Sequence, residues 1–479
     1  MCSSLIVQFA NNKTTMNTKA LRQKILDLAI HGKLVQQDPN DEPASVLLER
    51  IKAEKERLIK EGKIKRPKRS KAACDKPHYE KEAPFGIPDS WRWTTIEDIA
   101  ESNIGLTYKP SDICDNGIPV YRSNNIQNRR IDITDLVRVD TKILNKQYLA
   151  VGDLLICARN GSRRLVGKCA IIRELSEPSS FGAFMAVCRS AYNPWIYLLL
   201  NTSYFDRYLD DSNSTAINQV TQSMLLTFRV PFPPKKEQDR IIEEVNKWFK
   251  LIEMIEQRRE NLQTVISTTK SKILDLAIHG KLVPQDPTDE PASELLKRIN
   301  PKAEIACDNA HYRNLPKGWA EIKVGNVAEY TNGRAFKPEE WESVGLPIIR
   351  IQNLNDADAH YNRSSIIHEH KYLVKDGDLL FAWAASLGTY IWNGGDAWLN
   401  QHIFKVEPFS FIDKTYLFYV FQSMISEFYR NSHGSGMVHI TKKQFEEITL
   451  LLPPLSEQYR IVEFLERTLN VLDSINCNF

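Results

Sequence analysis

The sequence contains only eight cysteines among 479 residues, and no two of them form a Cys-x-x-Cys pair. Isolated cysteines in a long chain without a secretory signal are typical of reduced thiols, so we expect a cytoplasmic protein. No apolar run approaches the roughly 20 residues that a membrane-spanning helix needs, which predicts no membrane partner. The net charge is only +3, which is too small to indicate nucleic-acid binding by itself.

Recognisable catalytic motifs are also missing. The chain has no phosphate-binding Walker loop, no GxGxxG, no HExxH and no nucleophile elbow. His368 and His370 would lie on one side of a strand, but the pattern offers no third ligand, so we predict no metal site. The expectation is therefore a chain without catalytic residues and without a cofactor of its own.

What the chain does contain is an internal duplication. Residues 24–51 read KILDLAIHGKLVQQDPNDEPASVLLERI and residues 272–299 read KILDLAIHGKLVPQDPTDEPASELLKRI, so 24 of 28 positions are identical. Further along, the segments at 117–122, 152–155 and 233–241 return at 345–350, 377–380 and 453–461. Only two copies are present, which indicates internal symmetry and not a solenoid.

The duplication divides the central segment in an unusual way. Residues of about 235–300 occur once intact and once split, with the first half at the C-terminus and the second half at the N-terminus. In the intact copy, apolar residues from Ile241 to Ile273 alternate at spacings of four and three, including Val245, Ile252 and Ile255. This spacing predicts a coiled-coil helix of about 44 residues, and its expected partner is the split copy, packed antiparallel.

The predicted fold class is therefore α+β, with two α/β domains in a pseudo-twofold arrangement, joined by a long antiparallel helical coiled-coil spacer. The basic run 63–71 reads as a solvated linker or as a phosphate contact. The expected segments are a disordered extension (1–16), an N-terminal helical region with the basic linker (17–73), a first mixed domain (74–234), a central helical region (235–306), a second mixed domain (307–454) and a C-terminal helix (455–479) that completes the split region.

Both copies of the repeated helix end in Ile-His-Gly-Lys. Gly32 and Gly280 suit the left-handed position that follows a helix, so His31 and His279 are more simply explained as capping residues than as ligands or catalysts. The Asp-Glu-Pro segments at 41–43 and 289–291 predict the acidic first turn of a second helix.

Polar residues gather in turns that follow the predicted strands of both mixed domains. Arginine suits guanine, asparagine and glutamine suit adenine, and small or hydroxylated residues and lysine suit phosphate. Ordinary polar loops explain the composition equally well. The candidate DNA-binding residues are Arg122, Asn124, Asn125, Arg159, Asn160, Ser162, Arg163, Arg164, Thr215, Asn218, Arg350, Gln352, Asn353, Ser386, Ser435, His439, Thr441 and Lys442.

Taken together, these motifs resemble the specificity (S) subunit of type I restriction-modification systems. The resemblance covers about residues 17–479 and rests on the KILDLAIHGKLV and DEPAS helix pair, the Gly-Asp-Leu-Leu strands, the segment 397–405 and the Pro-Pro-x-x-Glu-Gln-x-Arg-Ile joints at 233–241 and 453–461. It implies two target-recognition domains that each read half of a bipartite, asymmetric site in double-stranded DNA, and it adds Asn400, Gln401 and His402 to the candidates. The chain departs from the family at Ser214-Thr215, where glycine often comes first, and by the insertion of Arg163-Arg164.

The resemblance also implies partner proteins. Two methyltransferase (M) subunits and restriction (R) subunits would dock on the helices, and S-adenosylmethionine, ATP and Mg would belong to them. Near-identical helices predict equivalent binding faces. The predicted partner-binding residues are Leu28, His31, Leu34, Leu276, His279 and Leu282. Two alternatives stay open: a fused restriction or methylation enzyme with an unrecognised motif, and a protein scaffold that reads no DNA, which the near-neutral charge favours.

Overall fold

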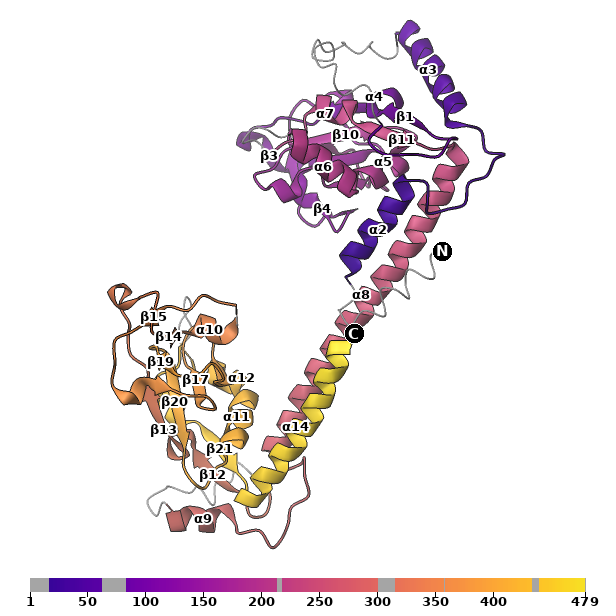
Figure 1. Cartoon of the computed structure of the whole chain (residues 1–479). Helices are drawn as coiled ribbons and strands as arrows, with labels where there is room; N and C mark the ends of the chain where they lie inside the picture. Colours follow the sequence, from indigo (N-terminus) through magenta and orange to yellow (C-terminus); the bar gives the residue numbers. More distant parts are fainter. Residues whose placement is uncertain are drawn as a thin grey trace. The chain divides into compact units, whose positions relative to one another are not determined.

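The computed structural model describes residues 17–62, 83–212, 218–299, 315–356, 358–432 and 439–478. They form two compact units, the first within residues 16–258 and the second within residues 259–479 (Figure 1). The predicted extension 1–16 and the basic run 63–71 lie outside the described residues. The six-segment division and the pseudo-twofold relation between the units stay predictions.

The first unit contains a mixed domain flanked by helices. Its helices are α2 (Thr18–Ile30), α3 (Ala44–Lys60), α4 (Ile96–Ile99), α5 (Asn193–Leu200), α6 (Ser203–Ser212) and α7 (Gln222–Thr227). Its strands are β1 (Arg92–Thr95), β2 (Glu101–Ile104), β3 (Ile113–Tyr121), β4 (Ile126–Gln127), β5 (Arg130–Ile131), β6 (Val137–Val139), β7 (Leu154–Cys157), β8 (Cys169–Ile171), β9 (Ser180–Phe181), β10 (Met185–Arg189) and β11 (Arg229–Phe232).

The second unit contains a mixed domain of the same kind. Its helices are α9 (Ala292–Ile299), α10 (Ile351–Asn355), α11 (Lys414–Ser423), α12 (Ile425–Arg430), α13 (Lys442–Glu447) and α14 (Leu455–Asn478). Its strands are β12 (Ala320–Lys323), β13 (Ala328–Asn332), β14 (Leu346–Ile349), β15 (Arg363–Ser364), β16 (Leu373–Val374), β17 (Leu379–Ala382), β18 (Gly388–Ile391), β19 (Ala397–Leu399), β20 (Ile403–Pro408) and β21 (Thr449–Leu452).

The two domains share one topology. The antiparallel sheet β2-β10-β7-β8 of the first has its counterpart in β13-β20-β17-β18 of the second. The sheet β6-β3-β9 corresponds to the first three strands of the sheet β15-β14-β19-β16, and the pairs β3·β9 and β14·β19 are both parallel. A separate ribbon, β1-β11 or β12-β21, joins the beginning of each domain to its end. The duplication in sequence is thus a duplication of fold, which confirms the predicted pair of α/β domains.

The predicted long helix is confirmed. Helix α8 (Lys235–Ile278) has 44 residues, and Ile241, Val245 and Ile252 are buried in its first half. The prediction for Ile255 is wrong, because 42% of this side chain stays exposed. Ile255 precedes Glu256, which pairs with Arg22 in the first turns of α2, so it lies at the start of this helix pair and not in its middle.

Each unit pairs one half of α8 with one half of the split copy (Figure 1). In the first unit, Arg22 of α2 contacts Glu256, while Asp41, farther along the chain, contacts Arg240. In the second unit, Asp473 of α14 pairs with Lys270, and Arg460 pairs with Asp289 beyond the end of α8. The order of contacts makes both helix pairs antiparallel, as predicted.

The repeated joints are explained by contacts within each unit. Arg240 Nη2 lies 2.6 Å from the Asp41 carboxylate, and Arg460 Nη2 lies 2.6 Å from the Asp289 carboxylate. The predicted acidic first turn is wrong: α3 begins at Ala44 and α9 at Ala292. Because each Asp-Glu-Pro segment precedes its helix, the aspartate carboxylate is free to reach the arginine across the joint.

The helix ends have the predicted left-handed glycines. The φ angles of Gly32 and Gly280 are 66° and 63°. The amide of Lys33 donates to the Leu28 carbonyl at 2.9 Å, and the equivalent bond in the second unit has the same length. This pattern closes a helix C-terminus.

Within the described residues, no helix combines the length and the apolar character required to cross a membrane.

Candidate nucleic-acid interface

Three polar loops of the first domain meet at one place. Asn160 Nδ2 donates to Ser123 Oγ at 3.2 Å, and Asn218 Nδ2 donates to the Gly161 carbonyl at 3.2 Å. These bonds join the turn after β3, the loop after β7 and the segment before α7. The sheet order places β3 and β7 in different sheets, so only the folded chain brings the predicted residues together.

Asp135 organises the first of these loops. One of its carboxylate oxygens accepts from Asn124 Nδ2 at 2.6 Å and from Arg122 Nη2 at 3.3 Å. Asp135 itself is 71% exposed, so it presents both side chains at the surface and offsets the charge of Arg122. Sequence reasoning could not select Asp135, because no turn motif or spacing links it to residue 122.

The other predicted residues of the first domain make different kinds of contact. The Arg159 guanidinium lies 5.5 Å from the centre of the Phe184 ring, and Phe184 is 61% exposed. Arg163 pairs with Asp210 at 2.5 Å, whereas Arg164 and Ser162 are exposed on the same loop. Thr215 lies outside the described residues.

The second domain uses the matching positions differently. The guanidinium carbon of Arg350 lies 5.7 Å from the centre of the Trp341 ring. Among the described residues, no carboxylate pairs with Arg350 as Asp135 pairs with Arg122. Gln352 is exposed beside it. A bridge between Ala384 and His439 joins two loops, as the bridge between Arg159 and Gln219 does in the first domain. Ser386 is half-buried nearby, and Ser435 lies outside the described residues.

The turn at residues 400–402 is conformationally strained. His402 has a φ of 74°, which non-glycine residues rarely adopt. Its ring lies 4.8 Å from that of Trp383, and its Nδ1 is buried without a hydrogen-bond partner in the described structure. Burial, and then the charge of His439, lower the pKa of His402 below its usual value. Asn400 Oδ1 accepts from the Gln401 amide at 2.9 Å, which shapes the same turn.

Asn125 and Asn353 have an internal role in the two domains. Asn125 is 1% exposed; it accepts from the Arg122 amide and donates to the carbonyls of Asp132 and Asp135. Asn353 is 5% exposed and makes the equivalent bonds to Arg350, Ala359 and His360. Both amides are fully used within the turn, so base contact by these two side chains stays a prediction without structural support.

Thr441 and Lys442 also bond within the domain. Thr441 is the N-cap of α13, and its hydroxyl donates to Gln444 Oε1 at 2.8 Å. Lys442 Nζ donates to the Tyr330 carbonyl at 3.0 Å and lies 3.5 Å from a Glu446 carboxylate oxygen. The Lys442 side chain is nevertheless 51% exposed, so its ammonium group stays accessible to a phosphate.

The predicted partner-binding residues are four leucines, which differ in burial, and two histidines. Leu34 is buried, and Leu282 packs against the core of the second unit. Leu28 and Leu276 are half-buried in both helix copies. The imidazoles of His31 and His279 each lie 2.7 Å from the carbonyl four residues earlier, so both act as helix caps. In the described part of the chain, no group of three or more His, Cys, Asp or Glu is placed to hold a metal ion.

Comparison with known proteins establishes the family. A family model described as the type I restriction modification DNA specificity domain matches residues 88–264 and 316–477. The chain belongs to this family. The EcoAI specificity subunit of Escherichia coli is 30% identical over 550 aligned residues, which cover 95% of this chain and 90% of that protein. The EcoKI specificity subunit of Escherichia coli strain K12 is 25% identical over 416 residues, covering 81% of this chain and 84% of its own.

A solved chain shares the fold. It comes from work on complex assembly and conformational transition of the type I R-M system, and it matches with a TM-score of 0.57 at 18% identity over 82% of this chain and 93% of that chain. The family match, and not the shared fold, makes the chain a type I specificity subunit, a protein that recognises DNA targets. Each range matched by the family model contains one mixed domain and one helical segment. Sequence reasoning missed Asp135, Phe184 and Trp341, which line the candidate interface of this specificity subunit.

Proposed function

We propose that each domain of this specificity subunit reads one half of a bipartite, asymmetric target in double-stranded DNA. The observation that carries the proposal is a shared framework with different exposed side chains. Asn125 and Asn353 fix the same turn in both domains. The residues that this turn presents differ, because Asn124 stands where Gln352 stands in the second domain. Equal frameworks with unequal surfaces suit the reading of two different half-sites.

The base-reading residues we propose are the exposed or half-exposed ones. In the first domain they are Arg122, Asn124 and Arg159, and in the second domain they are Arg350 and Gln352. Arginine offers a bidentate fork to guanine, and asparagine or glutamine offers one to adenine. Asn125 and Asn353 are left out of this set, because their amides already bond within the turn.

The helices are proposed to dock two methyltransferase subunits equivalently and, through them, restriction subunits. The repeated residues Leu28 and Leu276 are half-buried in both units, and Lys33 and Lys281 are exposed in both. These repeated positions keep accessible surface in both units, which a docked partner could cover. We propose that the chain itself is non-catalytic and cytoplasmic, with S-adenosylmethionine, ATP and Mg held by the partners.

A domain exchange tests the reading of half-sites. Residues 307–452 are replaced by the same domain of a related specificity subunit, and the target of the reconstituted complex is selected from random duplexes. One half of the target should change while the other half stays the same. If both halves change, or if neither does, independent reading by the two domains is wrong. A scaffold without DNA reading would enrich no sequence at all.

The mass of the reconstituted complex tests docking. Two methyltransferase subunits per chain are expected at saturation. Double replacement of Leu28 and Leu276 by aspartate should remove both, whereas either single replacement should leave one. A stable complex with one methyltransferase in the unmodified protein would contradict equivalent docking. Binding of S-adenosylmethionine by the isolated chain would instead favour a fused enzyme.

A further inference from the structure

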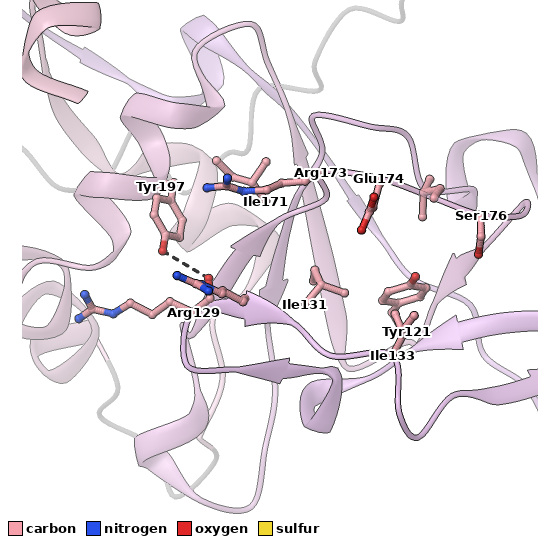
Figure 2. A pocket seen from close by; sticks show the side chains of 11 residues that line it. Tyr121, Arg129, Ile131, Ile133, Ile171, Arg173, Glu174, Ser176 and Tyr197 are labelled. Carbon is pink, nitrogen blue, oxygen red and sulfur yellow. Dashed lines mark hydrogen bonds between the residues drawn. The ribbon is translucent and has the colours of Figure 1, made fainter. Parts of the chain in front are cut away.

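The first domain contains an open hollow of about 720 Å³ that includes none of the predicted DNA-binding residues. Figure 2 shows Arg129, Arg173 and Tyr197 at one end, and Tyr121, Ile133 and Ser176 at the other. Leu175 and Ile131 add apolar surface between them. The volume falls in the range of small-molecule sites, which is roughly 300–1,000 Å³. One end is therefore cationic, and the other combines the Tyr121 ring and Ile133 with the polar Ser176 and Glu174.

The backbone at the cationic end is strained. Strands β4 and β5 are joined by a two-residue turn, Asn128 and Arg129, whose φ angles are 48° and 62°. A turn with positive φ at both positions strongly favours glycine at the second. An arginine at that position costs free energy in the folded backbone. Strain of this kind often marks a functional position.

The charges at this end are only partly compensated. Arg130 lies 3.1 Å from the Glu253 carboxylate, but neither Arg129 nor Arg173 forms an ion pair with any described residue. Arg129 lies 5.8 Å from the centre of the Phe249 ring, and its Nη1 is buried without a hydrogen-bond partner. The one carboxylate that lines the hollow is Glu174, which Figure 2 shows toward the far end. A buried donor without a partner calls for an explanation.

Tyr197 closes the cationic end from helix α5. Its hydroxyl donates to the Arg129 carbonyl at 3.4 Å, which is a long bond that another acceptor can replace. Burial raises the pKa of Tyr197 to about 12, although the neighbouring arginines Arg129, Arg173 and Arg130 act against the rise. The group therefore stays a neutral donor beside two guanidinium groups.

The second domain has no counterpart of this charge cluster. The amide of Gly152 donates to the Ile172 carbonyl, and the amide of Gly377 donates to the Trp392 carbonyl, so these positions match. The residue that follows Ile172 is Arg173 in the first domain, whereas the residue that follows Trp392 is Asn393 in the second. No arginine or lysine occurs between Arg350 and Arg363, the segment that corresponds to the β4-β5 hairpin. The shared fold therefore does not require these arginines.

We propose that this hollow binds a nucleotide, with its phosphate between Arg129 and Arg173 and its base against Tyr121, Ile133 and Leu175. Guanidinium groups match phosphate oxygens in bidentate geometry. Two arginines without an ion-pair partner among the described residues suit a dianion, and the Tyr121 ring with its aliphatic neighbours suits a planar base. The nucleotide comes either from free solution or from a DNA strand, and the second source rests on the proposed function.

Calorimetry on the full chain tests the free source. Deoxyadenosine monophosphate and inorganic phosphate are the probes, and deoxyadenosine is the control that lacks phosphate. Arg129→Gln and Arg173→Gln should each weaken binding of the monophosphate by about tenfold or more, because a charge-assisted contact is lost. Ser176→Trp, an exposed position, should block the hollow without removing charge. Arg57→Gln, on the exposed face of α3, should change nothing.

Salt dependence of duplex binding by the reconstituted complex tests the DNA source. The slope of log K against log salt is negative, and its magnitude should fall by about 1 for each arginine removed if the hollow binds a backbone phosphate. A response in either experiment supports the proposal and names the source. The proposal is overturned if the variants change neither, or if deoxyadenosine binds as well as its monophosphate. If the complex has no sequence preference, the proposed function fails, while the calorimetric test of the hollow still stands.

Discussion

The two mixed domains use one turn to present different chemistry. In the first domain, Arg122 contacts the Asp135 carboxylate, whereas in the second domain the equivalent Arg350 lies over the Trp341 ring. Beneath both arginines, an asparagine three residues later accepts a hydrogen bond from the arginine amide. The buried residue is thus repeated while its exposed neighbours differ. The comparison teaches that one fold is maintained twice while the side chains exposed on it differ.

The largest effect is expected when the shared turn is broken. Asn125→Ala and Asn353→Ala each remove several hydrogen bonds of a buried amide, so each should lower the free energy of unfolding by about 3 kcal/mol. Urea denaturation of the full chain measures the loss. Asn124→Ala and Gln352→Ala are the matched controls, and each should cost about 0.5 kcal/mol or less. Costs that differ widely between Asn125 and Asn353 would break the comparison.

The joints should respond equally in the two units. Asp41→Ala and Asp289→Ala each leave an arginine without its carboxylate. The side chains of Asp41 and Asp289 are 3% and 8% exposed, whereas their arginine partners are 35% and 36% exposed. We therefore expect a loss of about 2 kcal/mol, below the cost of a fully buried pair. Thermal unfolding measures it, and restoration of stability by simultaneous removal of the arginine distinguishes the ion pair from a general defect.

The exposed arginines should act on separate half-sites. Arg122→Gln and Arg350→Gln should each weaken specific binding by about 1 to 3 kcal/mol and relax base preference in one half-site only. Selection from duplex pools at fixed salt measures the preference. Asp135→Asn should affect the same half-site as Arg122→Gln, since its carboxylate contacts both Arg122 and Asn124. An effect of Asp135→Asn on the other half-site would contradict this assignment.

The smallest effect concerns pH. Burial raises the pKa values of Glu237 and Glu457, although Trp319 Nε1 donates to Glu457 at 3.0 Å. A carboxyl whose folded pKa is raised contributes stability that is fully present below its unfolded pKa of about 4.5 and is lost as pH rises through the folded pKa. Glu237→Gln and Glu457→Gln should remove this dependence to a similar extent. Denaturation at several pH values measures it, and a wild-type minus variant difference that is constant with pH would exclude the effect.

The central helix shows how far the sequence alone reaches. The alternating spacing of apolar residues predicts the length of α8, because such spacing puts one apolar stripe along a helix. The antiparallel partners of α8 follow instead from the split copy of the repeat. Ile255 fits that spacing and is nevertheless exposed, since its position relative to the beginning of α2 decides its burial. The Asp-Glu-Pro segments at 41–43 and 289–291 likewise fit the pattern of a first helix turn, although both helices begin after them. Local sequence does not reveal that Arg240 and Arg460 form ion pairs with the carboxylates of these segments.

The sequence by itself determined the duplication, the family and the two mixed domains, because identities at a regular offset and local periodicity are properties of the chain read in order. Only the tertiary structure decided which predicted polar residues reach the surface. Asn124 and Asn125 are adjacent and chemically identical, yet one is exposed and the other is 1% exposed. Arg173 lines the same hollow as Arg129 and Tyr197, which come from other segments of the chain. Burial and contact arise from chain segments that meet in space, and no single segment records its future neighbours.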